Sequence, residues 1–231
     1  MFNHLLQLVF IMFNVSRHRA IQTLLLTTAF STTGAFADDS KRTITFQEDV
    51  AKAQIIKLNL PVGRVVISGV VGSTIKADVI GSCKDATADA CKPLFDQLAW
   101  TKKLGTTAEF SLNPSSVMTY DNVDIQITIS LPKDKKLEIY QGAGELNLID
   151  TNACLTAELK AGELKIEASE SQLALANLAS TVGDVSLTNA KGQLTQGARS
   201  KLVGAEHTWK GAGKCQLKAN VLAGQVSLKL K

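Results

Sequence analysis

The stretch GELNLIDTNACLTAELKAGELKI, residues 144–166, decides the fold. It begins and ends with the same five-residue unit: a glycine, an acidic or polar residue, an aliphatic residue, a polar residue and a second aliphatic residue. Such alternation is typical of a half-buried β-strand. The unit recurs at 183–187 and 224–228, and weaker copies begin at Ala153, Ser171, Gly192 and Gly213. Each copy therefore predicts a short strand.

The spacing of the units predicts how these strands are arranged. From Gly144 to Gly192 the starts of successive units are 9, 9, 9, 12 and 9 residues apart, and gaps of 21 and 11 residues lead on to Gly213 and Gly224. We expect the longer gap to contain a degenerate unit at Gly204. A single unit cannot bury its apolar face alone, so units must stack, two to a coil of roughly 18 to 21 residues. The predicted fold is all-β: a β-solenoid or a stacked strand-repeat domain.

A continuous core follows from this stacking, because the aliphatic residues of every unit would point to the same side. Full burial of each such side chain contributes on the order of 1.5 to 3 kcal/mol. The residues expected inside are Leu146, Leu148, Leu155, Leu164, Ile166, Leu173, Leu175, Val185, Leu187, Leu194, Val226 and Leu228.

The chain before the repeats, residues 43–131, predicts further strands and one insertion. Apolar and polar residues alternate in several short runs, with Pro61–Gly63 as a turn between two of them. The one helix expected is short, from Asp85 to Leu98, where Asp85 would cap the start and Pro93 would shorten the helix. The expected strands are 55–61, 63–67, 74–80, 99–103, 108–112 and 123–132. No linker separates these runs from the repeats at 132–231, so residues 38–231 are expected to form a single β-repeat domain.

Residues 1–37 have the composition of a cleaved signal peptide. Basic residues at 17–19 precede an apolar run at 20–30, and Ala35-Phe36-Ala37 is a suitable cleavage site. Met12 is a possible true start, which would leave a signal of ordinary length. The alternative is an uncleaved anchor made of Leu5–Val15 and the apolar run, although Arg17 and Arg19 interrupt it.

The four cysteines suggest two disulfides in an exported chain. Cys83 and Cys91 are close enough in sequence to close a small loop, and Cys154 with Cys215 is the remaining pair. Cys215 could equally be a small buried hydrophobic residue on a strand. Zinc binding is not expected, because there is no C-x2-C pair and only one histidine follows the signal segment.

The charge balance removes two classes of partner. Arg17 and Arg19 lie in the segment expected to be removed, so 23 of the 25 basic residues remain against 21 acidic ones. A nearly neutral chain lacks the excess of basic residues that attracts nucleic acid or an anionic membrane surface. After residue 37 no stretch has the roughly 20 apolar residues of a membrane-spanning helix. We therefore expect neither a nucleic-acid partner nor an integral membrane segment in the mature chain.

The sequence resembles the family of bacterial adhesin-like strand-repeat proteins, which are also described as auto-transporter adhesin head domains. The resemblance is carried by LPVGRVVISG at 60–69, by ITISLP at 127–132 with Leu137-Glu138-Ile139 after it, and by the glycine units. It implies an exported, β-solenoid-like protein whose biochemical role is poorly defined, since function depends on a site and not on a fold. The Cys-bearing insertion and the irregular repeats between Gln196 and Gly213 depart from the pattern.

Glu145, Glu163 and Asp184 are the first candidate site. They occupy the same position in three units and would form an outward ladder if the coils stack in register. Carboxylates one strand apart are close to the roughly 5 to 5.5 Å separation used by retaining glycosidases, and they could also bind calcium. Against both roles, the position is expected to be flat and exposed, with Lys165 nearby. The interpretation favoured is a solvated polar face.

His207, Trp209 and Lys210 are the second candidate site, a small aromatic and basic patch in the degenerate repeat. It could contact a ligand or a sugar, although a loop in which Trp209 covers the core is the favoured interpretation. Three other aromatic residues are expected to pack in the core or at a sheet edge: Trp100, Tyr120 and Tyr140.

No motif in the sequence amounts to an active site, and no catalytic, cofactor-binding or metal-binding residue is predicted. We therefore expect a non-enzymatic, adhesin-like protein of the bacterial periplasm or cell surface, which presents an extended face to an envelope protein or glycan. Two alternatives remain. One is an envelope enzyme acting on polysaccharide, since solenoids offer long grooves. The other is a structural protein that self-associates through terminal strands such as Gln225–Lys231.

Overall fold

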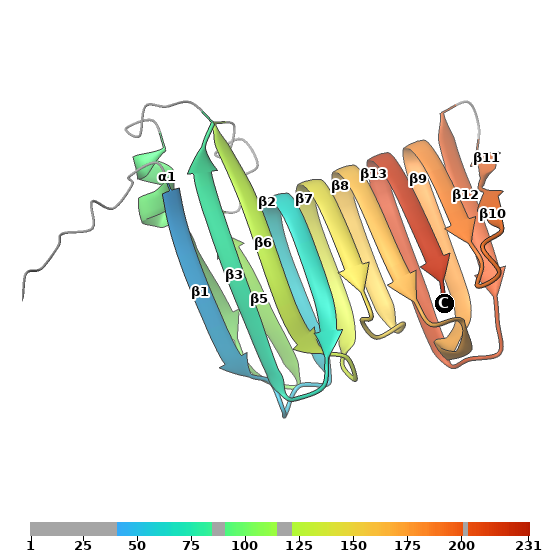
Figure 1. The fold of residues 1–231 in the computed structure, drawn as a ribbon, viewed down its shortest axis with the longest axis horizontal. Helices are drawn as coiled ribbons and strands as arrows, with labels where there is room; N and C mark the ends of the chain where they lie inside the picture. The colour runs from blue at the N-terminus through green and yellow to red at the C-terminus, as the bar shows by residue number, and fades with distance from the viewer. Residues whose placement is uncertain (1–40, 85–90, 115–121, 201–202) are drawn as a thin grey trace, which may run out of the picture. The chain divides into compact units, whose positions relative to one another are not determined.

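The computed structural model describes residues 41–84, 91–114, 122–200 and 203–231, and these form a 13-stranded mixed sheet with one short α-helix (Figure 1). The predicted signal segment and Asp85 lie outside this part of the chain. The strands are β1 (Lys41–Asp49), β2 (Ile55–Val70), β3 (Thr74–Cys83), β4 (Ala99–Lys103), β5 (Thr107–Asn113), β6 (Val123–Pro132), β7 (Lys136–Ile149), β8 (Leu155–Ala168), β9 (Leu173–Thr188), β10 (Leu194–Gln196), β11 (Ala198–Ser200), β12 (Gly204–Lys210) and β13 (Cys215–Leu230).

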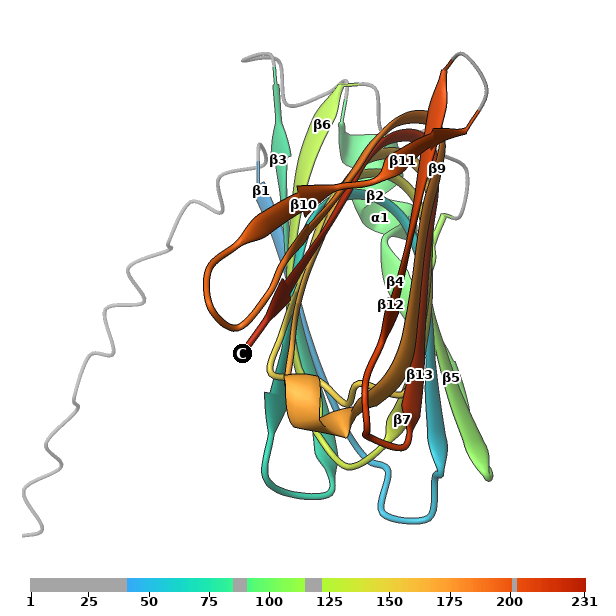
Figure 2. The same cartoon turned by 90° about the vertical axis from the view of Figure 1, so that its right-hand side faces the viewer.

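Five long strands, β2, β7, β8, β13 and β9, run parallel and make up the middle of the sheet. Each bends once and passes from one layer to another, and Figure 2 shows these bends as arches. We call the residues before the bend the first layer, which β5 and β12 extend, and those after it the second layer, which β6 and β10 extend. The core lies between the two layers.

A glycine stands at every bend, and the five glycines are neighbours in the sheet. Gly63 pairs with Gly144, Gly144 with Gly162, Gly162 with Gly224 and Gly224 with Gly183. Their φ angles lie between +118° and +137°, a region that residues with a side chain rarely adopt. A Cβ on Gly162 would also collide with the carbonyl oxygen of Gly144. The expected turn at Pro61–Gly63 is therefore wrong: it is a bend inside one continuous strand, β2.

The order of the strands in space differs from their order in the chain. The C-terminal strand β13 lies between β8 and β9 and pairs with both in parallel. The terminal strand Gln225–Lys231, which the self-association alternative used as a pairing edge, is therefore an interior part of the sheet. The degenerate unit at Gly204 does form a strand, β12, but it runs antiparallel to β9 and does not continue the parallel stack.

Ten of the twelve aliphatic residues expected inside are buried, and Leu175 and Leu194 are not. A β-bulge in the pairing of β13 with β9 skips Ala174, so the alternation in β9 changes face after Leu173. Ala176 and Leu178 point inward in place of Leu175. Leu194 lies on β10, a three-residue edge strand, and 62% of it is exposed.

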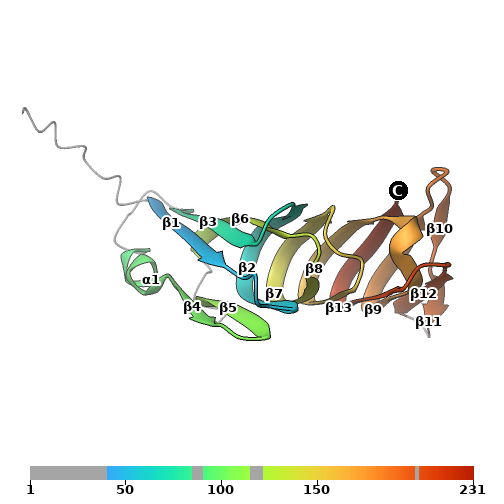
Figure 3. The ribbon, with the colours of Figure 1, turned by 90° about the horizontal axis from the view of Figure 1, so that it is seen from below.

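The helix α1 covers Lys92–Gln97 and is shorter than the helix expected from Asp85 to Leu98. Pro93 stands in its first turn, where its missing N–H would have had no partner. Leu94 and Phe95 are buried, and Phe95 lies against Gly81 of β3. Seen from below in Figure 3, α1 lies at the end of the sheet where β1 and β4 are found, opposite the end with β10, β11 and β12.

Candidate functional site: a polar groove on the first layer

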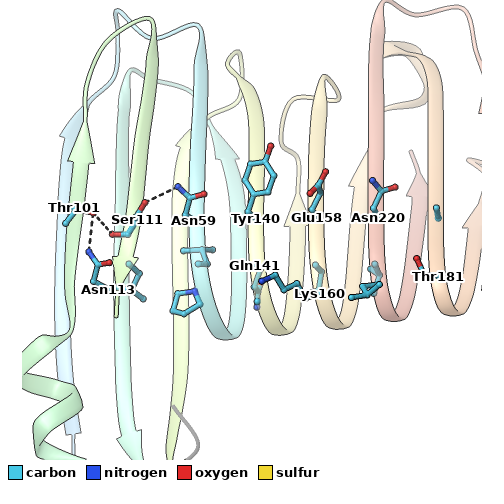
Figure 4. A pocket seen from close by; sticks show the side chains of 18 residues that line it. Asn59, Thr101, Ser111, Asn113, Tyr140, Gln141, Glu158, Lys160, Thr181 and Asn220 are labelled. Atoms are coloured by element: carbon cyan, nitrogen blue, oxygen red, sulfur yellow. Dashed lines mark hydrogen bonds between the residues drawn. The ribbon is translucent and has the colours of Figure 1, made fainter. Parts of the chain in front are cut away.

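A groove of about 740 Å³ runs along the outer face of the first layer. Strands β4, β5, β2, β7, β8, β13 and β9 all contribute to its lining, so it crosses the strands instead of following one of them. Figure 4 shows its central side chains in a row that projects from neighbouring strands. The row consists of Ser111, Asn59, Tyr140, Glu158 and Asn220.

Strand register explains why these side chains are aligned. Ser111 pairs with Asn59, Asn59 with Tyr140, Tyr140 with Glu158, and Glu158 with Asn220. From β2 onward each member is the residue four places before a bend glycine. Because the glycines stack in register, the residues at a fixed distance from them stack as well. The floor of the groove is well packed, since Leu159 and Val221 beneath it are buried.

Hydrogen bonds fix the end of the groove at β4 and β5. Nδ2 of Asn59 donates to Oγ of Ser111 over 3.0 Å and to Oε1 of Glu109 over 2.9 Å. Nδ2 of Asn113 donates to Oγ1 of Thr101 over 3.2 Å. The hydrogen bond from Asn59 and the ion pair with Lys57 lower the pKa of Glu109. This end is therefore organised before any ligand arrives.

The middle of the groove has side chains with unused hydrogen-bonding capacity. Within the described ranges, Glu158 and Asn220 make no side-chain hydrogen bond or ion pair, and the ring of Tyr140 has Nζ of Lys57 over it, 5.5 Å from the ring centroid. All three are half-buried. Tyr140, which we expected in the core or at an edge, thus lies in the middle of an outer face. Trp100 does pack as expected, with its ring 5.8 Å from that of Phe46, and Tyr120 lies outside the described residues.

A buried glutamine supports the groove from the inner side of β7. Gln141 is only 3% exposed, and its Nε2 donates to the carbonyl oxygens of Gly63 and Ala143, both at 2.9 Å. Ser180 plays the same part on β9, where its Oγ donates to the carbonyl oxygen of Gly224 over 2.8 Å. These hydrogen bonds connect buried side chains of the first layer to the backbone at the bends.

The predicted ladder of Glu145, Glu163 and Asp184 is only partly formed. Glu145 and Glu163 are neighbours, but Gln225 of the inserted strand β13 separates Glu163 from Asp184. Lys165 forms ion pairs with both Glu145 and Glu163, at 3.2 and 2.8 Å.

Two arginines compensate the remaining charge on this ladder. Arg64 pairs with Glu145 and Arg199 with Asp184. Hydrogen bonds from Asn147 and Lys165 lower the pKa of Glu145. The acids are thus engaged with cations on the second layer, away from the groove. Across the described residues, no three His, Cys, Asp or Glu side chains are placed to hold a metal ion.

The predicted patch of His207, Trp209 and Lys210 is divided by the alternation of β12. His207 and Trp209 are half-buried, and Trp209 packs against the core, whereas Lys210 is exposed on the opposite face. The three side chains therefore do not form one ligand surface. The interpretation in which Trp209 covers the core agrees with this packing.

Both expected disulfides are present, Cys83–Cys91 and Cys154–Cys215. The second joins the residue before β8 to the first residue of β13, and so fixes the inserted strand to its neighbour. In the part of the chain that is described, no helix has the length and hydropathy required to span a membrane.

No family model matches the chain, and no curated protein matches it. Three solved structures are similar, and two of them are described here. One is a "putative cell adhesion protein" from Clostridium sporogenes, with 14% identity, a TM-score of 0.48, and coverage of 83% of this chain and 100% of that one. The other is a "putative adhesin" from Bacteroides fragilis, with 12% identity, a TM-score of 0.25, and coverage of 84% and 99%. At these TM-scores the similarities assign neither a family nor an activity.

Proposed function

We propose that this chain is an exported, adhesin-like binding protein of the bacterial envelope, and that its groove holds an extended partner. The observation that carries the proposal is the row of Tyr140, Glu158 and Asn220, whose side chains lie in register above a packed floor. Among the described residues, Glu158 and Asn220 make no side-chain hydrogen bond or ion pair, and the ring of Tyr140 has Nζ of Lys57 over it. Polar groups arranged in this way are available to a ligand at little cost in ordering. The scaffold is a solenoid-like stack of one domain, residues 38–231, in which the bend glycines set the register.

Export is supported by the sequence of residues 1–37 and by the two disulfides, which persist in oxidising compartments. The periplasm or the cell surface is therefore the proposed location. A partner there would be met by the outer face of the first layer, where the groove lies.

A polysaccharide-cleaving enzyme is the second candidate, because a groove across several strands also suits a polymer. The described lining of the groove contains one carboxylate, Glu158. Glycoside hydrolysis by the usual route needs two carboxylates on either side of the bond. Binding without cleavage is therefore the better supported role.

The proposal is tested by capture of envelope material on the chain purified after export. We expect the wild-type protein to retain a component of washed envelopes, and the double variant Tyr140→Ala, Asn220→Ala to lose it. Gln225→Ala is the matched control, because Gln225 is an exposed residue of the same strand as Asn220 but lies on the second layer. Equal retention by the double variant, or none by the wild-type protein, would contradict the proposal.

A further inference from the structure

We infer that the ligand of the groove is an uncharged glycan several sugar units long, lying across the strands with one ring against Tyr140. This inference rests on the proposed function and specifies the chemistry of the partner. Five properties of the groove support it: the engagement of its backbone in the sheet, its hydrogen-bonding side chains, its charge, the ring of Tyr140 and the length of the row.

The backbone of the groove is not available to a peptide. Each of the four central strands, β2, β7, β8 and β13, is paired on both sides in the first layer, so its N–H and C=O groups are engaged in the sheet. Peptides that bind to a sheet commonly add as a further strand at an open edge, with main-chain hydrogen bonds as the source of affinity. The groove has no such edge at its centre. A ligand here must be recognised by side chains.

The side chains match hydroxyl groups. Amides and hydroxyls line the groove at Asn59, Ser111, Asn220 and Thr181. Asn220 and Thr181 can both donate and accept a hydrogen bond, whereas Asn59, whose N–H groups are engaged with Ser111 and Glu109, can accept through Oδ1, and Ser111 can donate through its hydroxyl. A sugar hydroxyl has the same double capacity. Glu158 can accept two hydrogen bonds from neighbouring hydroxyls of one ring, since its carboxylate has two oxygens and makes no other side-chain hydrogen bond among the described residues.

The charge of the groove disfavours a charged polymer. Glu158 and Lys160, both on β8, are the charged side chains of the described lining, and their formal charges cancel. Recognition of an anionic chain would need an excess of basic groups, as in phosphate binding. A basic peptide would need the opposite excess. A neutral, hydroxyl-rich chain fits a groove without net charge.

Tyr140 supplies the apolar contact that such a chain needs. Its ring combines a flat apolar surface with a polar tip, which suits the C–H face and the hydroxyl rim of a sugar ring. Tyr140 is half-buried in the middle of the row, with Asn59 on one side and Glu158 on the other. A ring seated on Tyr140 would therefore meet polar groups at both of its edges.

The length of the row sets the length of the ligand. Ser111, Asn59, Tyr140, Glu158 and Asn220 lie on five successive strands, and strands are about 4.8 Å apart, so the row extends about 19 Å. A single sugar would contact one or two of these positions. Each further ring adds contacts without a second loss of overall motion, so affinity should rise steeply with chain length.

The test is isothermal titration of the exported chain with defined probes: neutral hexasaccharides of glucose and of N-acetylglucosamine, the corresponding monosaccharides, and polygalacturonate as an anionic polymer. We expect a neutral hexasaccharide to bind and its monosaccharide and polygalacturonate not to bind. Tyr140→Ala and Asn220→Ala should each weaken binding about tenfold or more, which corresponds to the loss of one good contact. Tyr140→Phe should retain most of the affinity, and Gln225→Ala all of it.

The other outcomes separate this inference from the proposed function. If no neutral hexasaccharide binds while envelope material is still retained in a Tyr140-dependent way, the glycan inference is overturned and the proposed function stands. Tighter binding of polygalacturonate, or binding of hexasaccharide that Tyr140→Ala leaves unchanged, also overturns it. If neither the hexasaccharides nor the envelopes are bound, both fall together.

Discussion

Single glycines set the geometry of this protein. At each of the five bends, φ is positive and the space for a Cβ is taken by the carbonyl oxygen or backbone of a neighbouring strand. A substitution there has two separate costs, the backbone conformation and the collision. Gly72, between β2 and β3, has only the first, because its φ is +141° and no atom lies within 4 Å of a Cβ built on it.

The pair Gly162→Ala and Gly72→Ala therefore separates the two costs. We expect Gly72→Ala to lower the free energy of unfolding by about 1–2 kcal/mol, the usual cost of a left-handed conformation for a residue with a side chain. Gly162→Ala should lower it by at least twice as much, because the neighbouring strands β7 and β8 must move apart to admit the methyl group. Urea unfolding followed by circular dichroism measures both. Equal losses would show that the bends have more room than the structure indicates.

The ion pairs of Glu145 predict a dependence of stability on pH. Asn147 and Lys165 lower the pKa of Glu145 in the folded protein from its ordinary value of 4.5. The stabilisation is therefore fully present above the unfolded pKa, near 4.5, and is lost as the pH falls through the lower folded pKa. Because the side chain is 30% exposed, we expect less than about 1 kcal/mol.

Glu145→Gln tests this assignment. The difference in free energy of unfolding between the wild-type protein and the variant should be constant from pH 7 to pH 5 and should shrink below about pH 4. Urea unfolding at each pH gives the difference. A difference that grows on acidification would have the wrong sign for a carboxyl group with a lowered pKa.

At the scale of elements, the local alternation of the sequence was sufficient to predict most strands and most of the core. Strand β4 has the predicted bounds, and Leu146, Leu164 and Val226 are buried as expected. The wrong predictions fall where a β-bulge or a short edge strand interrupts the alternation, because the alternation of residue types predicts neither. The bulge at Ala174 turns Leu175 outward, and the short edge strand β10 leaves Leu194 exposed.

The groove was missed because its residues share a position and not a residue type. Tyr140, Glu158 and Asn220 each stand four places before a bend glycine, so an alignment of the units on their glycines would have placed them in one row. The ladder one place after the glycines was found because its residues are acidic. Its compensation by Arg64 follows from the same alignment, since Arg64 stands one place after Gly63 as Glu145 does after Gly144, and the two residues pair across β2 and β7.

The disulfide between Cys154 and Cys215 secures one element, the inserted strand β13. Its half-cystines are 61 positions apart, against 8 for Cys83–Cys91. A cross-link that closes a longer loop removes more conformational entropy from the unfolded chain. Replacing Cys154 and Cys215 by serine should therefore lower the free energy of unfolding by about 4 kcal/mol, and the same change at Cys83 and Cys91 by about 2.6 kcal/mol. Urea unfolding of the two double variants measures this order, and a reversed order would contradict it.

At the scale of the whole sheet, the strand order makes β13 the connection between two halves. On one side of it lie β8, β7 and β2, and on the other β9 and β12. Removal of residues 211–231 exposes the edges of β8 and β9 that face β13. We expect that the remaining chain no longer unfolds in a single cooperative thermal transition. Removal of residues 38–49 should preserve that transition, because β1 pairs with β3 alone. Thermal melts followed by circular dichroism distinguish the two, and a cooperative melt of the first variant would contradict the assigned order.

The central place of β13 also limits how such a protein could be enlarged during evolution. Duplication of the last unit in the gene would produce a strand with no vacant neighbour, since both sides of β13 are occupied. Among the described strands, new strands could be accommodated only at those that pair on one side, which are β1, β4, β10 and β11. A domain fused after Lys231 would be attached at the end of an interior strand. Such a domain could not add a strand to the sheet next to β13, so the length of the linker would decide whether the fusion is tolerated.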